Sequence, residues 1–285
     1  MEVTPEMVKK LRDKTGVGIG DCKKALVEAG GDFDKADKIL KEKGLASAAK
    51  RAGRTNDEGR VFAHVKGTRS GIIQMACETD FVARNADFTA FSVAIAKEMI
   101  EAGQTEVNAD QDQRLKDLGA KIKENITVKA VSYMDAGVDE LVGDYVHMVN
   151  DVGRIGVLIK LKAADAAKAA GLKTLANDLA LTVAAYNPLY MTRSDVPAAF
   201  ITEQEEIFAT QMSQDESLQS KPENVKQGIL KGKVNKLLAE ICLVDKPFIR
   251  DDKSTVAQAL EKASKEMGTK IELVAYKQLR IGQDN

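Results

Sequence analysis

The chain contains no tryptophan, only two histidines and only three cysteines among its 285 residues. The cysteines, Cys22, Cys77 and Cys242, lie far apart and form no CxxC pair, which excludes a disulfide framework and a cysteine-rich zinc site. With only His64 and His147 available, metal chemistry and histidine-based triads lack the residues they need. There are eight phenylalanines and five tyrosines, so any binding surface must depend on few aromatic anchors.

A strong excess of one charge is also absent. The formal net charge is −1 and the isoelectric point is near 6.2, which argues against a dedicated nucleic-acid-binding protein, because such proteins neutralise phosphates with a basic excess. Residues 1–54 are an exception, with 13 Lys and Arg against 9 Asp and Glu, and Lys50, Arg51 and Arg54 cluster at their end. A solvated linker explains this cluster better than a phosphate contact. A nucleic-acid-associated protein that uses this basic linker is the alternative.

Long apolar runs are missing too. None approaches the roughly 18 residues that span a bilayer, so no membrane is expected as a partner. The acidic, helix-capping start at Met1–Glu6 does not have the pattern of a signal peptide. Scattered cysteines fit a reducing compartment. We therefore expect a cytoplasmic protein, and its length predicts roughly two domains.

The N-terminal segment predicts three short helices. Thr4 precedes a proline and an acid, which is the pattern of a helix start. Asp21 and Asp32 are predicted to cap the second and third helices, and Gly44 to end the third. Residues 46–58, rich in Ala, Lys, Arg and Gly, are interpreted as a linker with some helix at its start.

From residue 59 the apolar period changes from 3.6 to 2, which predicts strands at residues 59–66 and 72–77, followed by a helix. The same order returns with strands at 143–148 and 156–161 and a helix over 172–185. Glycine-bounded strands followed by a helix thus occur twice, at a nearly constant offset. We interpret this as a duplicated α+β unit, with chance similarity as the alternative.

Residues 197–244 predict an antiparallel helical hairpin. Leu230, Val234, Leu237 and Ile241 are spaced 4, 3 and 4 residues apart, as in a short coiled-coil seam. The polar flanks of this seam indicate that the hairpin projects from the body, while an ordinary internal helix pair is the alternative. The hairpin could pair with a second copy to form a homodimer, with a partner, or with nothing.

The C-terminal segment predicts one more helix and one more strand. The helix includes Val256 and ends at Gly268. Ile271, Leu273 and Ala275 then alternate with other residues, which predicts a strand with these three side chains on one face.

Motifs for catalysis are absent. The segment closest to a Walker A loop, Gly228–Val234, is one residue short between its glycines and lacks the Ser or Thr that would hold magnesium. The glycine-rich run Gly16–Gly20 joins two predicted helices rather than a strand and a helix. No GxSxG elbow or HExxH pair occurs. We therefore expect a protein that is not an enzyme, binds no cofactor and works through an interaction surface.

One turn stands out as a candidate for that surface. Thr79 can cap a helical turn that comes after the buried strand, and Asp80 places a carboxylate beside the large ring of Phe81. A rigid ring on a well-held turn suits insertion into a partner, because few rotamers are lost when it docks. On pattern alone, Phe81 as an ordinary core residue is the more frequent outcome.

Five runs carry a resemblance to a known family: KTGVG at 14–18, DCKKAL at 21–26, ETDFVARN at 78–85, GRIGVL at 153–158 and PF at 247–248. Together they resemble the elongation factor Ts family, the guanine-nucleotide exchange factors of elongation factor Tu. The runs occur in the family's order and span most of the chain. The first two motifs are specific, and their spacing makes coincidence a poor explanation.

The resemblance implies an α+β fold with an N-terminal three-helix, ubiquitin-associated-like domain, a core of two related α+β subdomains and an inserted coiled-coil hairpin. The implied boundaries are 1–54 for the helical domain and linker, 55–140 for the first subdomain, 141–196 and 245–285 for the second subdomain with a short tail, and 197–244 for the hairpin.

The resemblance also implies the partner and the contact residues. The chain would bind elongation factor Tu with GDP and promote GDP release, so that GTP can bind. The turn at Phe81 would insert between helices of the partner's nucleotide-binding domain, and the N-terminal domain would grip another helix. Where the family often has a histidine in the second subdomain's helix, this chain has Thr182. The implied contact residues are Thr79, Asp80, Phe81, Val82, Cys22, Lys23, Ile155 and Gly156.

Overall fold

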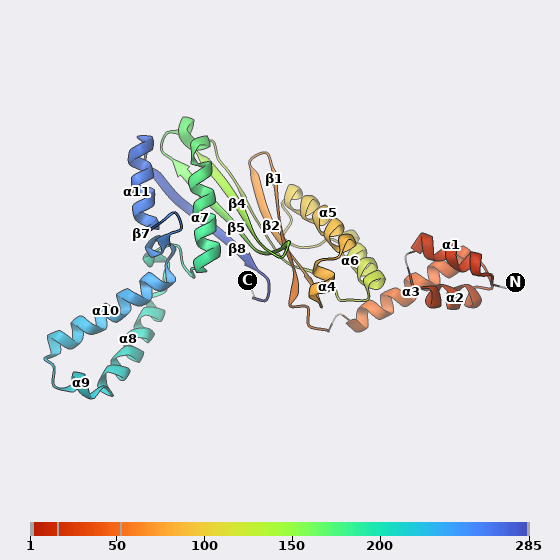
Figure 1. Cartoon of the computed structure of the whole chain (residues 1–285), viewed down its shortest axis with the longest axis horizontal. Helices are drawn as coiled ribbons and strands as arrows, with labels where there is room; N and C mark the ends of the chain where they lie inside the picture. The colour runs from red at the N-terminus through yellow and green to blue at the C-terminus, as the bar shows by residue number, and fades with distance from the viewer. Residues whose placement is uncertain (1–2, 16, 52, 284–285) are drawn as a thin grey trace.

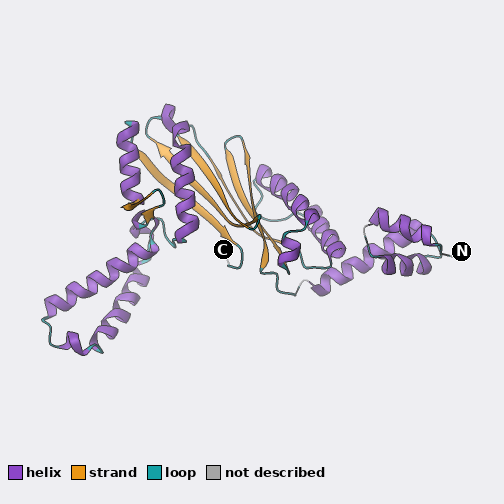
Figure 2. Ribbon diagram, in the orientation of Figure 1, coloured by secondary structure: helices purple, strands orange, loops and turns teal. Residues whose placement is uncertain are grey.

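The structure is a computed structural model that describes residues 3–15, 17–51 and 53–283. Figure 1 shows three parts along the longest axis: three N-terminal helices at one end, a body of two antiparallel sheets covered by helices, and a helical hairpin at the other end. Figure 2 shows that the strands are confined to the body. Helices and separate antiparallel sheets together confirm the predicted α+β class.

The N-terminal helices begin where their capping residues predict. They are α1 (Pro5–Thr15), α2 (Ile19–Glu28) and α3 (Phe33–Arg51). Thr4 Oγ1 accepts a hydrogen bond from the backbone N–H of Met7 at 3.3 Å. Asp32 Oδ1 accepts from the backbone N–H groups of Asp34 and Lys35, both at 3.0 Å. Both capping predictions are confirmed, and the three helices enclose a small apolar core of their own.

Two predictions in this region were wrong. Helix α2 begins at Ile19 with Gly18 as its N-cap, so Asp21 lies in the first turn and does not cap the helix. Its carboxylate there still faces the positive end of the helix dipole. Helix α3 does not end at Gly44 but continues to Arg51. One glycine costs a helix about 1 kcal/mol, and the alanine-rich run after it has the propensity to offset that cost.

The first sheet consists of β1 (Glu58–Lys66), β2 (Arg69–Cys77) and β3 (Thr127–Asp135), antiparallel and in that order. Three helices connect β2 to β3, namely α4 (Asp80–Ala83), α5 (Ala86–Ala102) and α6 (Ala109–Ile122). Strand β2 lies in the centre and is buried on both faces, as its apolar composition predicts. The sequence patterns did not predict α6 or β3.

The second sheet consists of β4 (Glu140–Val149), β5 (Val152–Ala163) and β8 (Ile271–Arg280), again antiparallel and in that order. Between β5 and β8 lie η1 (Ala166–Leu172), α7 (Lys173–Tyr186), the hairpin, the short strands β6 (Pro247–Phe248) and β7 (Asp251–Thr255), and α11 (Val256–Met267). Two strands, a helical connection and a third strand beside the second therefore occur twice, which confirms the two related units.

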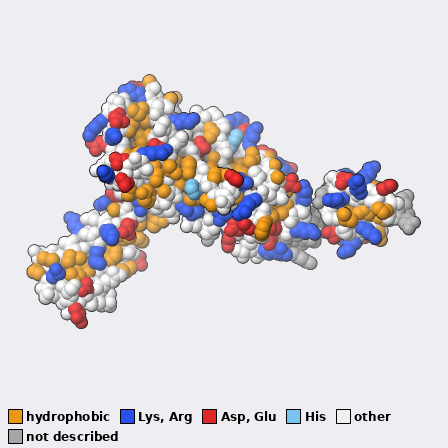
Figure 3. Space-filling model, in the orientation of Figure 1, with side chains coloured by type: hydrophobic (Ala, Val, Ile, Leu, Met, Phe, Trp, Pro, Cys, Tyr) orange, Lys and Arg blue, Asp and Glu red, His pale blue; other side chains and the backbone are white. Residues whose placement is uncertain are grey.

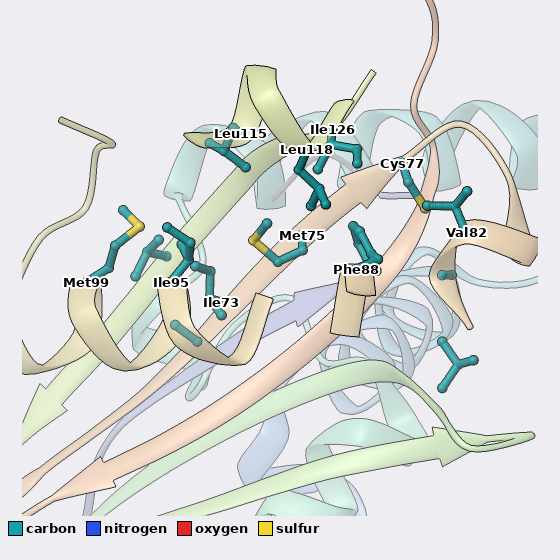
Figure 4. Close-up of a cluster of buried hydrophobic side chains, with 14 of the residues drawn as sticks. Ile73, Met75, Cys77, Val82, Phe88, Ile95, Met99, Leu115, Leu118 and Ile126 are labelled. Atoms are coloured by element: carbon teal, nitrogen blue, oxygen red, sulfur yellow. The ribbon is translucent and has the colours of Figure 1, made fainter. Parts of the chain in front are cut away.

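The two sheets pack face to face, with helices on their outer sides. Figure 1 shows α5 and α6 outside the first sheet and α7 and α11 outside the second. The innermost apolar cluster joins the sheets through Val61, Ile72 and Leu158. Figure 4 shows the cluster between the first sheet and its helices, to which Phe88 of α5 and Met75 of β2 both belong. Side chains alternate between these layers because successive strand residues point to opposite faces.

Strand β8 departs from its predicted alternation. Ile271 and Leu273 pack in the cluster under α7 and α11, whereas Ala275 packs in the cluster between the sheets. A register shift opposite Lys160 and Leu161 inserts one extra residue into β8. Because strand side chains alternate with a period of two, this bulge moves every later side chain to the other face. The prediction that all three share one face was wrong for this reason.

The hairpin consists of α8 (Ala198–Ser213), the single turn α9 (Glu216–Gln219) and α10 (Glu223–Ile241). Figure 1 shows that it projects from the body, as predicted. Val234, Leu238 and Ile241 are buried at its base, while Leu237 of the predicted seam is half-buried. Only the base is thus closed by the body, and the pairing of two copies through this hairpin stays a prediction.

Candidate partner-binding site

The α4 turn presents Phe81 to solvent. The chain leaves β2 at Cys77, and Thr79 caps a single helical turn by accepting a hydrogen bond from Val82 N at 3.4 Å. Val82 and Ala83 face inward and are buried, whereas the side chain of Phe81 is 80% exposed. An aromatic ring this exposed is not a core residue, so the alternative that Phe81 belongs to the core was wrong.

A carboxylate from a distant segment clamps this turn. Glu124 Oε1 accepts from the Thr79 hydroxyl at 2.6 Å, and Glu124 Oε2 accepts from the backbone N–H groups of Glu78 and Thr79 at 2.9 and 3.2 Å. Glu78 in turn accepts from the backbone N–H of Asn125 at 2.7 Å. Hydrogen bonds to a carboxylate are short and strong, so the start of α4 is held in one geometry. Sequence reasoning missed Glu124 because no local pattern links it to residues 45 positions earlier.

Asp80 and Cys77 flank the turn in different ways. Asp80 forms an ion pair with Arg84 at 3.2 Å, one turn along and about half exposed, so it rests beside Phe81 at the surface. Cys77 is buried, and its thiol donates to the carbonyl oxygen of Thr79 at 3.2 Å. Burial raises the pKa of Cys77 to about 12, with the Glu124 and Glu58 carboxylates adding to the effect. The thiol is therefore protonated at neutral pH, the form in which it is a poor nucleophile.

The β4–β5 turn approaches the same end of the body. Val152, at the start of β5, belongs to the same buried cluster as Val82 of α4. Arg154 forms an ion pair with Glu58 of β1 at 2.7 Å. A Cβ on Gly153 would lie 2.3 Å from the carbonyl oxygen of Val61, so glycine is needed for β5 to pass this close to β1. These contacts bring the β4–β5 turn of the second subdomain beside the α4 turn.

The comparisons with known proteins agree on one family. A family model described as Elongation factor TS matches residues 78–283. Elongation factor Ts of Borrelia recurrentis is 48% identical over 284 residues, which is 99% of this chain and 100% of the relative. Those of Borreliella burgdorferi strain ZS7 and Treponema denticola are 46% and 40% identical, covering 98% and 96% of this chain and 99% and 96% of the relatives.

The chain belongs to the elongation factor Ts family. Its role therefore lies in translation elongation, as the resemblance of the sequence runs implied. The matched range begins at Glu78, the first residue of the run that contains the α4 turn. The residues of the α4 turn thus lie within the range that the family model matches.

Ile155 and Gly156 lie in strand β5 with little surface of their own. Ile155 is 7% exposed and packs under α7. A Cβ on Gly156 would lie 2.4 Å from Val61 Cγ1 and 3.2 Å from Ile72 Cγ2, so this glycine allows the two sheets to approach. Both residues thus have packing roles, and contact with a partner through them stays a prediction.

Cys22 and Lys23, the two predicted contact residues in the N-terminal helices, lie in the core and at the surface, respectively. Cys22 is fully buried, and its thiol donates to the carbonyl oxygen of Val17 at 3.4 Å. Lys23 is exposed on α2, between the exposed side chains of Ile19 and Val27. Residues spaced by four lie on one face of a helix, so Lys23 is flanked by apolar groups on that face. Of the two, only Lys23 has a side chain that could meet a partner.

Thr182, at the position where the family often has a histidine, is fully buried. Its hydroxyl donates to the carbonyl oxygen of Asp178 at 2.8 Å and accepts from the backbone N–H of Ile249 at 3.3 Å. The side chain thus ties α7 to the segment between β6 and β7. Because its hydroxyl is bonded within the chain and the side chain is buried, Thr182 presents no group to a partner.

The basic cluster lies at the end of α3 and just beyond it; the side chains of Lys50 and Arg51 are outside the described part of the structure, and Arg54 is described. Arg54 forms an ion pair with Glu78 at 3.3 Å, and its backbone carbonyl accepts from the Asn125 side chain at 3.1 Å. It therefore fastens the start of the body to the clamped turn. On the face shown in Figure 3, basic and acidic side chains are interspersed, and no single basic tract covers it.

Within the part of the chain that the structure describes, no group of three or more His, Cys, Asp or Glu side chains is arranged to hold a metal ion. No helix among the described residues is both long and apolar enough to cross a membrane. What the site does offer is an exposed ring on a clamped turn. Such a surface can bind a partner and displace groups of that partner.

Proposed function

We propose that the chain is a guanine-nucleotide exchange factor that binds elongation factor Tu carrying GDP, promotes GDP release and so permits GTP to bind. The observation that carries this proposal is the exposed Phe81 on the clamped α4 turn of a chain in the elongation factor Ts family. The activity belongs in the cytoplasm, where translation takes place.

Exchange of this kind needs no chemical step in the factor. If the factor weakens nucleotide binding by a certain ratio, the nucleotide weakens factor binding by the same ratio, because the two binding events are thermodynamically linked. The factor must fit the nucleotide-free partner better than the GDP-bound form. Accelerating release 10⁴-fold corresponds to about 5.5 kcal/mol, an amount that a few strong contacts can supply.

Phe81 is suited to supply the largest part of the binding free energy that accelerates GDP release. A buried phenylalanine ring removes a large apolar area from water and has few rotamers to lose. The Glu124 clamp fixes the turn before binding, so little ordering is needed when the ring enters a pocket. Asp80 brings a negative charge to the same insertion point, where it would compete with the phosphates of the bound nucleotide for cationic groups of the partner.

The experiment measures release of a fluorescent GDP analogue from elongation factor Tu, with excess unlabelled GDP, as the chain is titrated. We expect the release rate to rise with chain concentration to a plateau far above the intrinsic rate. Capture of elongation factor Tu by the immobilised chain should weaken as GDP is added. A release rate that does not change with chain concentration would refute the proposal.

Phe81→Ala identifies the surface responsible. Loss of a central aromatic anchor costs at least about 2 kcal/mol of binding, so the exchange efficiency should fall about thirtyfold or more. The matched control is Val138→Ala, because Val138 is 90% exposed in the turn between β3 and β4, outside the candidate site. This variant should promote GDP release like the parent chain. Equal losses of exchange efficiency in the two variants would show that Phe81 has no special part in exchange.

A further inference from the structure

Arg60 lies at the meeting point of the two subdomains. It sits in β1, on the face that the first sheet turns towards α4 and α5, and its guanidinium lies 5.3 Å from the ring centre of Phe62. One nitrogen, Nη1, donates to the carbonyl oxygen of Ala83 at 3.4 Å and to the Thr89 hydroxyl at 2.9 Å. The other, Nη2, donates to the carbonyl oxygen of Asp151 at 2.7 Å.

These acceptors come from three separate segments. Ala83 is the last residue of α4, Thr89 lies in the first turn of α5, and Asp151 lies in the turn between β4 and β5. Asn150 and Asp151 adopt φ angles of +48° and +63°, a two-residue turn geometry that Asn and Asp tolerate best. The planar guanidinium of Arg60 therefore joins the α4 turn of the first subdomain to the β4–β5 turn of the second.

This link costs stability. The surroundings remove water from the guanidinium, which lowers the pKa of Arg60 from its ordinary value, and the Asp151 carboxylate opposes part of that shift. Among the described residues no hydrogen-bond partner lies within reach of its buried Nε. Burying a charged group with one donor unsatisfied is unfavourable. An apolar side chain at this place in β1 would avoid the cost but could not hold the three carbonyl and hydroxyl oxygens together.

The joined turns both carry exposed apolar side chains. Phe81 is the exposed residue of α4, and Met148 and Val149, which lead into the β4–β5 turn, are 49% and 45% exposed. Exposed apolar groups on two neighbouring rigid segments form a binding surface only if their relative position is fixed.

We propose that Arg60 is a positioning residue, which fixes the α4 turn against the β4–β5 turn so that Phe81 and the pair Met148–Val149 meet the partner as one preorganised surface. This inference rests on the proposed function. It assigns to the β4–β5 turn of the second subdomain a part of the contact with elongation factor Tu. Arg60 touches no partner group itself and acts through the two turns.

The test uses the full-length chain in the GDP-release titration with Arg60→Met, which removes the hydrogen bonds but keeps an apolar chain of similar length. We expect about a tenfold loss in exchange efficiency. Arg60→Lys should fall between the two, since an ammonium keeps the charge but lacks the planar fork that spans several acceptors. The matched control is Arg114→Met, because Arg114 also lies over a phenylalanine ring, Phe91, and pairs with Glu98, away from α4. Arg114→Met should exchange like the parent chain.

A double-mutant cycle separates positioning from simple loss of stability. Val149→Ala should reduce exchange several-fold in the parent chain and have less effect in the Arg60→Met background, because a hairpin turn that is no longer fixed contributes less. Val149→Ala effects of equal size in the two backgrounds would overturn the proposal, as would an Arg60→Met chain that exchanges normally. A parent chain that fails to accelerate GDP release would instead refute the proposed function, so the two failures are distinguishable.

Discussion

The two subdomains share one topology and differ in the segment that comes after the second strand. In the first, β2 leads into α4, which leaves the Phe81 ring exposed. In the second, β5 leads into η1, where Leu172 is fully buried. Lys168 on η1 donates to the carbonyl oxygen of Met267 at 2.7 Å and so ties η1 to the end of α11. The second subdomain uses this connection to close its own core, and the first uses it to present a side chain.

The subdomains also differ in what their last connection carries. In the first, α5 and α6 return directly to β3. In the second, the path from α7 to β8 includes the projecting hairpin and α11. Because insertions between the second and third strands leave the three-stranded sheet unchanged, a duplicated scaffold can acquire different surfaces at one equivalent place. The exposed Phe81 ring and the projecting hairpin thus both lie in connections between the second and third strands.

The largest effect is expected when the buried aromatic of the first subdomain is removed. Phe88→Ala, at the start of α5, should lower the free energy of unfolding by about 3–5 kcal/mol, because Phe88 is fully buried. Phe81→Ala, seven residues earlier, should change it by less than about 0.5 kcal/mol. Urea unfolding measures both. Similar losses of stability in the two variants would contradict the assignment of Phe81 to the surface and Phe88 to the core.

The Glu124 clamp belongs to the first subdomain. Glu124→Gln keeps the size of the side chain but turns one acceptor oxygen into a donor that faces the N–H and O–H groups at Glu78 and Thr79. Losing a charge-assisted hydrogen bond costs about 1.5–3 kcal/mol. We expect a loss of stability of that order and about a tenfold slower GDP release, since the turn is no longer held.

Glu98→Gln is the matched control, because Glu98 pairs with Arg114 on the outer helices of the same subdomain. GDP release by this variant should match that of the parent chain. If Glu124→Gln and Glu98→Gln slow release equally, the clamp has no special part in exchange.

The packing between the subdomains can be tested at Gly156. In Gly156→Ala the new methyl group would lie 2.4 Å from Val61 Cγ1, and overpacking of a closed core costs about 1–3 kcal/mol. Gly228→Ala on α10 is the control, since a Cβ there meets nothing within 4 Å, and it should raise stability by about 0.5–1 kcal/mol through helix propensity. Thermal unfolding of the two variants should therefore shift in opposite directions. Equal shifts would show that the sheets do not meet closely at Gly156.

The smallest effect concerns an ion pair at the surface of the first sheet. Arg69 Nε donates to Asp135 Oδ1 at 2.7 Å, and this hydrogen bond lowers the pKa of Asp135 from its ordinary value of 3.8. Because the folded pKa is depressed, the pair contributes stability above about pH 4 and loses it as the pH falls further. Asp135→Asn should cost less than about 1 kcal/mol at pH 7 and a smaller amount at about pH 3. Urea unfolding at the two pH values checks this, and a pH-independent difference would contradict it.

Much of the fold could be predicted from local patterns. Thr4 and Asp32 cap helices because their side chains satisfy backbone groups within three residues. The repeated strands were visible because alternation reflects burial on the pleated sheet. The region from α6 to β3 was missed, and the bulge in β8 reversed the expected face of Ala275. A bulge depends on the neighbouring strand, which the local pattern does not contain.

The candidate site divides in the same way. The run at 78–85 marked the turn, and the capping role of Thr79 could be inferred from its residue type. Exposure of Phe81 could not, since an apolar residue after a buried strand is more often part of the core. The supporting residues Glu124 and Arg60 act across 45 and 91 positions of sequence, so no local signal could identify them.

The sequence by itself determined the α+β class, the duplicated unit, the helical hairpin and, through its runs, membership of the elongation factor Ts family. Those features depend on periodicity, capping and motif spacing, which act over a few residues. The tertiary structure alone decided that Phe81 faces solvent, that Glu124 clamps its turn and that Arg60 joins the two subdomains. These latter features depend on segments brought together by burial of the three apolar layers, and burial is a property of the whole chain.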